Sequence, residues 1–422
     1  MSYQPVLTAR LGVVDPTSLA DYEAHGGFQA LAKAIELGPQ AVIETARQAH
    51  VLGRGGAAFP AGIKWKSVAD QPGPKYMVVN ADESEPGTFK DRIIMEGDPF
   101  SVVEGMMVAA FAAGAEQGYI YIRGEYPWAV ARVQHAVNAC HNAGYLGRNI
   151  LGSGWNLDVE VRKGAGAYIC GEETALFESI EGKRGFPRIK PPFPTQVGLF
   201  GRPTLINNVE TLLCALPLVL RGPHWFKDIG PEDSPGPKLF CLSGRVHKPG
   251  LVEAPMGTSI RTLIEEYGGG VAGSGELGGV LLGGAAGMFV GPAALDVNLD
   301  FATLREIDAA LGSGVVMVFD SSVEIGQVLK RIGRFFAHES CGKCYPCQIG
   351  TQRQMEIVDR LAEGRSRPGD LILLRDVGQT MTDASICGLG QTANGAIRTA
   401  LDRFGYHEAT GQFTRFGTNG KH

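Results

Sequence analysis

The sequence predicts a multi-domain α/β protein, in which a mostly parallel sheet covered by helices precedes a small α+β module and a helical segment. Three observations lead to this prediction. After residue 50, short β-branched runs alternate with helical patterns, as in parallel sheets. The stretch DSPGPK at 233–238 has the composition of a linker. From Val323 onward the spacing of apolar residues is helical again.

The individual elements follow one another in a regular order. The first fifty residues read as a helical lead-in that is interrupted at Gly38-Pro39. In the α/β part we expect strands at 75–81, 118–123 and 156–162, helices at 99–116 and 126–144, and a further helix that opens at GEET. Beyond the linker, KLFCLSGRV, GLVEAP, a helix at 258–267 and VVMVFD predict a small β-rich module that ends near residue 320.

Composition excludes several classes of protein. A chain of 422 residues with 44% hydrophobic and 20% charged residues can bury large cores and is not disordered. The net charge of −5 argues against nucleic acid as a partner. The longest apolar run, 106–115, is too short to cross a bilayer, and no secretory signal opens the chain. Eight cysteines then indicate thiols or metal ligands rather than disulfides, and we expect a cytoplasmic protein.

Three cysteines at a spacing of three residues form the sharpest motif. Cys341, Cys344 and Cys347 lie in ESCGKCYPC, and such a run supplies three corners of a cubane cluster. Cys387 lies downstream in the same helical segment, so we expect it to be the fourth ligand of a [4Fe–4S] cluster. A structural zinc ion is the alternative, although zinc sites usually pair two knuckles or add histidines. For the four other cysteines we expect buried structural thiols: Cys140, Cys170, Cys214 and Cys241.

A glycine-rich segment, GRGGAAFPAGIKW, precedes the first strand. Gly53, Gly55 and Gly56 would let backbone amides approach an anion closely, with Lys64 nearby as a point charge. Phe59 would be an exposed ring that could stack on a flat heterocycle. The glycines do not follow the dinucleotide fingerprint G-x-G-x-x-G, and an ordinary loop is the alternative interpretation.

Acidic residues follow the first strand in VVNADESEPGTFKDR. Asn80, Asp82, Glu83 and Glu85 would gather acceptors at the carboxyl edge of a parallel sheet, where such folds bind ligands. Carboxylates there suit ribose or ribityl hydroxyls and would repel an additional phosphate. A solvated loop is the alternative.

Two later segments add further candidates. Glu172 and Glu173 lie where the helix at GEET begins, and they could bind a ligand or only complement the helix dipole. The proline-braced segment RIKPPFP contains Lys190 and Phe193. It is followed by Asn207-Asn208 at a helix start, where the amides could hold a ligand or cap the helix.

Taken together, these segments resemble the NADH-binding flavoprotein subunit (the 51-kilodalton type) of respiratory complex I. The same family includes the diaphorase subunits of NAD-linked hydrogenases and formate dehydrogenases. The resemblance rests on GRGGAAFPAG, NADESEPGTFKDR, GAGAYICGEETAL, KPPFPTQVGLFGRPT, NNVETL and ESCGKCYPC, which together cover most of residues 50–390. It implies a helical N-terminal lead-in (1–50), a Rossmann-like FMN- and NADH-binding domain (51–235), a β-grasp (ubiquitin-like) domain (238–320) and a C-terminal helical bundle with the cluster (323–422).

The resemblance also implies roles for individual residues. For FMN they are Gly53, Arg54, Gly55, Gly56, Lys64, Asn80, Asp82, Glu83, Gly171, Glu172, Glu173, Asn207 and Asn208. For NADH they are Phe59, Glu85, Glu173, Lys190 and Phe193, with Glu85 disfavouring the 2′-phosphate of NADPH. No side chain acts as nucleophile or base, because the flavin carries the chemistry. Glu83 and Glu172 would tune its charge environment.

The activity implied is that of an NADH dehydrogenase subunit of complex I (NADH:quinone oxidoreductase), which passes a hydride to FMN and single electrons to the cluster. A hydrogenase or formate dehydrogenase diaphorase is the alternative, and a flavin-free scaffold subunit is the alternative of another class. Expected partners are a thioredoxin-like [2Fe–2S] subunit and a multi-cluster subunit, through which the chain would lie on the inner face of the cell membrane without inserting into it.

The sequence departs from the family pattern at identifiable positions. Ala58 replaces the glycine of the usual GRGGAGF, and Ala61 stands where threonine is common. Lys66-Ser67 follow the KW pair in place of a second aromatic residue. The ending SICGLGQTA resembles the hydrogenase and formate dehydrogenase branch, whereas the length of the chain favours complex I.

Overall fold

A computed structural model describes residues 3–407, 410 and 412–413. The chain divides into two compact units. The first contains residues up to Ser84, Phe89–Leu239 and Glu253–Gly257, and the second contains Glu85–Thr88, Phe240–Val252 and the residues from Thr258 onward.

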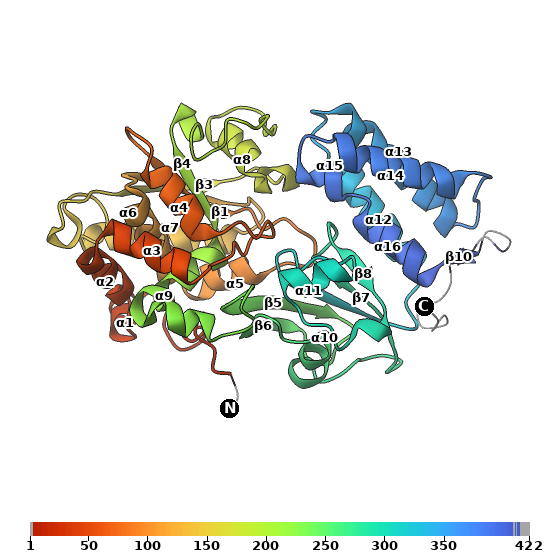
Figure 1. Ribbon diagram of the computed structural model, residues 1–422, viewed down its shortest axis with the longest axis horizontal. Coiled ribbons are helices and arrows are strands. Elements are labelled where there is room, and N and C mark those ends of the chain that lie inside the picture. Colours follow the sequence, from red (N-terminus) through yellow and green to blue (C-terminus); the bar gives the residue numbers. More distant parts are fainter. Residues whose placement is uncertain (1–2, 408–409, 411, 414–422) are drawn as a thin grey trace. The chain divides into compact units, whose positions relative to one another are not determined.

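The first unit is built around a parallel four-stranded sheet of order β3-β2-β1-β4 (Figure 1). Its strands are β1 (Tyr76–Ala81), β2 (Gln117–Ile122), β3 (Asp158–Lys163) and β4 (Thr204–Asn208). From β1 the chain adds β2 and β3 on one side, whereas β4 returns to the other side of β1. The strand order therefore reverses between β1 and β4, and the carboxyl ends of strands at such a reversal form the usual ligand site of open α/β sheets.

Helices surround this sheet. They are α1 (Leu19–Ala24), α2 (Gln29–Leu37), α3 (Pro39–Gln48), α4 (Ala61–Ala69), α5 (Lys90–Gly97), α6 (Pro99–Ala113), α7 (Pro127–Asn142), α8 (Glu173–Ile180) and α9 (Val209–Lys227), with short turns η1 (Ile150–Gly152), η2 (Tyr168–Gly171) and η3 (Leu199–Gly201). Apolar and small residues cover nearly the whole circumference of α6, which is buried almost throughout. Gly105 allows close packing of α6 on α9, because an added Cβ would lie 2.8 Å from the Leu212 carbonyl oxygen.

The N-terminal helices are tied to α6 through one buried carboxylate. Glu104 accepts hydrogen bonds from the Tyr22 hydroxyl and from the backbone N–H groups of Phe28 and Leu31. Burial raises the pKa of Glu104, and these hydrogen bonds oppose that rise. The predicted interruption at Gly38-Pro39 is confirmed, since Gly38 has φ +83° and Pro39 begins α3.

The second strand system is a five-stranded sheet of order β6-β5-β9-β7-β8. Its elements are β5 (Pro237–Gly244), β6 (Gly250–Pro255), β7 (Leu277–Leu282), β8 (Met288–Val290) and β9 (Val315–Asp320), with α10 (Ile260–Thr262), the π-helical turn η4 (Leu263–Tyr267), η5 (Pro292–Ala294) and α11 (Phe301–Glu306). β5 pairs with β9 in parallel, while β9 with β7 and β7 with β8 are antiparallel. This mixed sheet with few short helices is the β-grasp domain.

The C-terminal part of the second unit is helical, as Figure 1 shows in blue. It contains α12 (Ile325–Glu339), α13 (Tyr345–Ala362), α14 (Asp370–Ala384), α15 (Gly388–Thr392) and α16 (Gly395–Phe404), followed by β10 (Tyr406–His407) and β11 (Gln412–Phe413). Two glycines let these helices approach closely, because Gly350 lies against Met381 and Gly378 against Asn394. Among the residues that the structure describes, no helix has the length and apolar character needed to cross a membrane.

The predicted strands and long helices are confirmed, with ends shifted by a few residues. The sequence did not predict α5, β4, β7 or β8 as separate elements. The expected linker is also wrong in part: residues 234–238 are buried, and Pro237 already begins β5. Gly236, with φ +95°, packs so closely on the Phe226 ring that no side chain would fit there.

Candidate functional site

Side chains of the first unit meet where the strand order reverses. Asn80 and Asn208 are register partners at the carboxyl ends of β1 and β4. Asn80 donates to the Gly171 carbonyl (2.8 Å) and accepts from the Asp82 N–H (3.2 Å). Asp82 in turn accepts from the Ser84 hydroxyl (3.0 Å). The acidic segment predicted to follow β1 thus lies at the expected edge of the sheet.

Asn208 is the centre of a polar network in this unit. Its side-chain oxygen caps α9 by accepting from the Glu210 N–H (3.0 Å), so the capping interpretation of the sequence is confirmed. The same oxygen accepts from Lys90 (3.0 Å), and the amide nitrogen donates to Asp91 (2.6 Å). Neighbouring Asn207 accepts from the indole N–H of Trp65 (2.9 Å).

Buried charges extend this network inward. Lys238 is fully buried and contacts both carboxylate oxygens of Glu210, and Lys90 lies 3.2 Å from the same carboxylate. Burial lowers the pKa of Lys238 to about 8, although Glu210 opposes the change. Burial would raise the pKa of Glu210, but Lys238 and Lys90 outweigh it and hold the pKa below its usual range. The acid is therefore ionised at neutral pH.

The glycine-rich segment lies against Asn208. An added Cβ at Gly55 would be 3.0 Å from the Asn208 Cβ, so glycine is needed for this approach. The Arg54 side chain does not face solvent: it is buried, one guanidinium nitrogen donates to the Pro235 carbonyl (2.7 Å), and Nε and Nη1 have no partner in the structure. Ala58 has φ +54°, a conformation that favours the glycine usual at this position.

Glu83 is buried beside the same edge. Its carboxylate accepts the N–H groups of Asp91 and Arg92 (both 2.9 Å) and so caps the start of α5, while its backbone carbonyl accepts from Arg123. Burial, followed by the nearby charge of Asp91, raises the pKa of Glu83 to about 7, although Lys90 and the two N–H groups oppose this rise. This carboxyl group therefore titrates near neutral pH.

The start of α8 carries the second acidic pair. Glu172 caps this helix by accepting the N–H groups of Thr174 and Ala175 (both 2.9 Å), as its position at GEET allowed. Lys190 contacts Glu172 (2.9 Å) and Glu173 (2.6 Å), and Lys64 lies 3.6 Å from Glu173. Burial would raise the pKa of Glu173, but the two ammonium groups outweigh it and lower the pKa.

Two aromatic rings predicted to stack on a ligand are exposed in the first unit. Phe59 and Phe193 expose about half of their surface, 50% and 53%. The Lys64 ammonium lies 5.8 Å from the centre of the Phe59 ring. Glu85, the remaining residue of the expected NADH set, belongs to the second unit, where its carboxylate accepts the Ala286 N–H (2.9 Å).

The four candidate cluster cysteines lie in the helical part of the second unit. Cys344 and Cys387 immediately precede α13 and α15, and Cys347 is in the first turn of α13. The two helices meet at Gly390, where an added Cβ would be 2.8 Å from the Cys347 Cβ. In the described part of the chain, no three His, Cys, Asp or Glu side chains have the arrangement of a metal site.

The other four cysteines are buried, as predicted for structural thiols: Cys140, Cys170, Cys214 and Cys241. Burial raises the pKa of Cys140 well above its ordinary value and that of Cys214 to about 11. These two thiols therefore stay protonated and unreactive at neutral pH.

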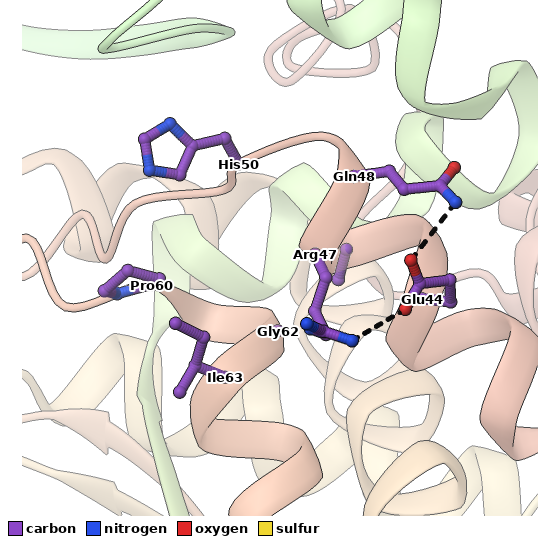
Figure 2. A pocket seen from close by; sticks show the side chains of 8 residues that line it. Glu44, Arg47, Gln48, His50, Pro60, Gly62 and Ile63 are labelled. Carbon is purple, nitrogen blue, oxygen red and sulfur yellow. Dashed lines mark hydrogen bonds and ion pairs between the residues drawn. The ribbon is translucent and has the colours of Figure 1, made fainter.

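A separate surface cavity of about 240 Å³ lies between α3 and the start of α4 (Figure 2). Its lining comes from Glu44, Ala46, Arg47, Gln48, His50, Pro60, Gly62 and Ile63. Figure 2 shows Arg47 and Gln48 both directed at Glu44, with which they form hydrogen bonds of 2.9 and 3.2 Å. This lining includes none of the residues expected to bind FMN or NADH, and its charged groups already pair with each other.

Several residues of the site were not predicted from the sequence. Lys90 and Asp91 stand in the quoted motif NADESEPGTFKDR, and Trp65 ends GRGGAAFPAGIKW, yet neither motif assigns them a role on its own. The available signal for Trp65 was its position directly after Lys64, a predicted site residue, on α4. Nothing in the sequence indicated that Lys90 would be buried, because lysine is rarely fully buried.

Comparisons with known proteins give concordant results. Residues 46–216 match the model of the Nuo51 FMN-binding domain, 238–318 that of the SLBB domain, and 327–409 that of the NADH-ubiquinone oxidoreductase-F iron-sulfur binding region. The chain is 48% identical over 404 residues to an NADH-quinone oxidoreductase subunit of Rhizobium meliloti, and the match covers 95% of this chain and 96% of the relative.

Other relatives carry different names. NADP-reducing hydrogenase subunit HndC of Solidesulfovibrio fructosivorans is 42% identical, over 94% of this chain and 81% of the relative. The crystal structure of an NAD⁺-reducing [NiFe]-hydrogenase in the air-oxidized state aligns with a TM-score of 0.82 at 35% identity. That alignment covers 95% of this chain, which spans 66% of the hydrogenase chain.

Proposed function

The chain belongs to the family of NADH-quinone oxidoreductase subunits that contain the Nuo51 FMN-binding domain, and on that premise we propose that it oxidises NADH with FMN and a [4Fe–4S] cluster. The observation that carries this proposal is the meeting of Asn80 and Asn208 at the reversal of strand order, with Gly55 packed against Asn208. A cofactor at this edge of the sheet is what the fold favours.

The residues at this edge fit FMN by their chemistry. Backbone amides of the glycine-rich segment 53–56 and the Lys64 ammonium suit a phosphate, while Asn80 and Asp82 suit the hydroxyl groups of the ribityl chain. Gly171 borders these groups, because an added Cβ would be in ordinary contact, at 3.5 Å, with the Asp82 carbonyl and with its carboxylate. Arg54 is buried away from the surface and would act through the backbone of the segment.

The NADH side of the site uses other residues. Phe59 and Phe193 offer exposed rings for stacking on the adenine, and Lys190 with Glu173 offers polar groups for the ribose. Glu85 would accept from the ribose hydroxyls and repel a 2′-phosphate. These residues orient the dinucleotide, and orientation is the main contribution a protein makes to hydride transfer.

The cysteines fit a cluster by their number and placement. Cys341, Cys344 and Cys347 would supply three ligands from one short segment, and Cys387, which precedes a helix that packs at Cys347, would supply the fourth. When bound, FMN accepts a hydride and releases electrons singly, and the cluster takes up single electrons. The buried charges of Glu83, Lys90 and Glu210 fix the electrostatic field around the site, and Glu172 holds Lys190 in place.

Electrons leaving the chain need an acceptor. We expect a thioredoxin-like [2Fe–2S] subunit and a multi-cluster subunit as partners of the helical part, and a cytoplasmic location on the inner face of the cell membrane. Named relatives are described as subunits of larger enzymes, which supports the existence of partners without identifying them.

A diaphorase subunit of an NAD-linked hydrogenase is the second candidate. The hydrogenase relative and the hydrogenase crystal structure support it, together with the ending SICGLGQTA. The two functions share the same site and differ in the partner. Subunits that co-purify with the chain from its native cells distinguish them.

The direct test uses the purified full-length chain. We expect bound flavin, iron and acid-labile sulfide, and reduction of ferricyanide by NADH. Protein with iron and sulfide but no flavin would support a scaffold subunit instead, and zinc without sulfide would overturn the cluster. Asn208→Ala should lose flavin but keep iron, because it alters only the first unit.

A further inference from the structure

The Cys347 thiol has a hydroxyl neighbour at the end of the preceding helix. Ser340 directly follows α12, and its Oγ lies 3.3 Å from Cys347 Sγ. Cys347 itself is buried in the first turn of α13. Either atom of this pair could donate in the free thiol, but a thiolate has no proton, so the hydroxyl becomes the donor once Cys347 binds a metal.

A second hydroxyl, that of Ser385, is buried without a partner. Ser385 precedes Cys387 by two residues and exposes 6% of its surface. Within the part of the chain that the structure describes, no group forms a hydrogen bond with its Oγ. Its backbone carbonyl, in contrast, accepts from the Gln391 side chain (2.9 Å). A buried hydroxyl without a partner costs stability, so this group points to a partner that the folded chain alone does not supply.

Gly390, which is buried in α15, brings Ser385 and Cys347 to the same place. An added Cβ on this glycine would be 2.3 Å from Ser385 Oγ and 2.8 Å from Cys347 Cβ. Both atoms therefore border the space that a side chain at position 390 would occupy. Any such side chain would have to displace the serine or the cysteine. Glycine at this position thus keeps the unpartnered hydroxyl next to Cys347.

We propose that Ser340 and Ser385 donate hydrogen bonds to the Cys347 sulfur when it binds the cluster, and that they thereby raise the reduction potential of the cluster. This inference rests on the proposed function, in which Cys347 is a cluster ligand. On reduction the cluster gains one electron and no bond breaks, so its sulfurs become more negative. A hydrogen bond to a sulfur stabilises that added charge and makes the gain of the electron more favourable.

The test is a redox titration of the full-length chain, in which electron paramagnetic resonance follows the reduced cluster. Ser385→Ala removes the buried hydroxyl and should lower the equilibrium constant for reduction about tenfold, which is about 59 mV for one electron. Ser366→Ala is the matched control, because it removes a hydroxyl from the loop after α13, at the opposite end of that helix from Cys347. The control should keep the potential of the unaltered chain. A potential in Ser385→Ala that equals or exceeds that of the control would overturn the inference.

A second measurement separates a hydrogen bond from a change in packing. In deuterated water, a hydroxyl that donates to a cluster sulfur carries an exchangeable deuteron, and pulsed electron paramagnetic resonance measures its magnetic coupling to the reduced cluster. Ser385→Ala should lose part of the coupling that the unaltered chain shows, whereas Ser366→Ala should keep all of it. An identical coupling in Ser385→Ala and in the unaltered chain would show that this hydroxyl does not donate to the sulfur.

A second pair of variants covers the case in which Ser385→Ala does not fold or does not retain a cluster. Ser340 is only half-buried, so substitutions there disturb the core less. Ser340→Ala removes the hydroxyl and Ser340→Thr retains it, so the potential should fall in the alanine variant alone. Equal potentials in these two variants would contradict the role of Ser340. If the unaltered chain contains no iron or acid-labile sulfide, the proposed function itself fails, which is a distinguishable result.

Discussion

Lys90 donates a hydrogen bond to the side-chain oxygen of Asn208 over 3.0 Å, and both partners lie at the edge where the strand order reverses. Burial would lower the pKa of Lys90, but Asp91 and Glu210 outweigh it and raise the pKa above its ordinary value. Lys90→Met should therefore leave buried carboxylates without their cation and cost about 3–5 kcal/mol of stability. Denaturant unfolding measures the loss. Lys66→Met breaks an exposed pair with Asp70 and should cost under about 1 kcal/mol. Equal effects of the two substitutions would contradict the network.

Glu83 makes stability depend on pH near neutrality. A carboxyl whose pKa is raised to about 7 in the folded state keeps its proton where the unfolded chain has lost it. Stability should therefore fall as pH rises from about 4.5 through 7, by up to on the order of 3 kcal/mol. Glu83→Gln should remove this component, as unfolding curves across that range would record. Glu96→Gln, in the Arg92–Glu96 ion pair of the helix that Glu83 caps, should keep the wild-type slope.

The same residue should influence the flavin. Removing a negative charge near FMN makes its reduction more favourable, so Glu83→Gln should shift the flavin midpoint potential upward. The shift should be larger above about pH 7 than below it, because Glu83 is ionised only there. Redox titration at two pH values measures it, and an identical potential in both proteins at high pH would refute the tuning role.

Ala58 lies in a conformation that glycine adopts without strain. With φ +54°, an alanine costs roughly 1–2 kcal/mol relative to an unstrained residue. Ala58→Gly should raise the unfolding free energy by about 1 kcal/mol, after subtracting the entropy cost of glycine. Ala57→Gly, at a neighbouring position without positive φ, should lower it slightly. Thermal unfolding of both variants decides the matter, and a loss at position 58 would show that the alanine is not strained.

Of the four cysteines inferred to bind the cluster, Cys387 lies farthest from the others in the sequence. Cys387→Ser should lower the iron and sulfide content and the cluster absorbance, while flavin in the first unit is retained. Cys140→Ala, which alters a thiol buried in α7, should keep the cluster. Full iron content in Cys387→Ser would require another fourth ligand.

The sequence predicted the regular elements well where local signals were strong. β1, β2 and β3 contain runs of β-branched or aromatic residues. Gly38 and Pro39 separate two helices, because glycine adopts a positive φ and proline favours the start of a helix. β4 was missed because it is short and ends in two asparagines, which strands disfavour, and pairing with β1 holds it in the sheet. β7 contains Gly278 and Gly279, which mask its strand character.

The site was likewise predicted only where local sequence motifs carry its chemistry. Asn80, Asp82 and Asn208 carry their chemistry in local motifs, and the sheet brings Asn80 and Asn208 together. The burial of Lys90 and the inward direction of the Arg54 side chain depend on which charges surround these groups after folding. No local pattern reports that Glu210 lies 3.2 Å from Lys90, since the two are far apart in the chain.

The turn Glu85–Thr88 belongs to a different unit from the residues on either side of it. The chain therefore leaves the first unit for four residues and returns, long before the main body of the second unit begins. A fragment starting at β5 would lack the residues that cover Cys241 and Val315. Limited proteolysis near residue 238 would therefore separate the β-grasp sheet from a turn that packs on it.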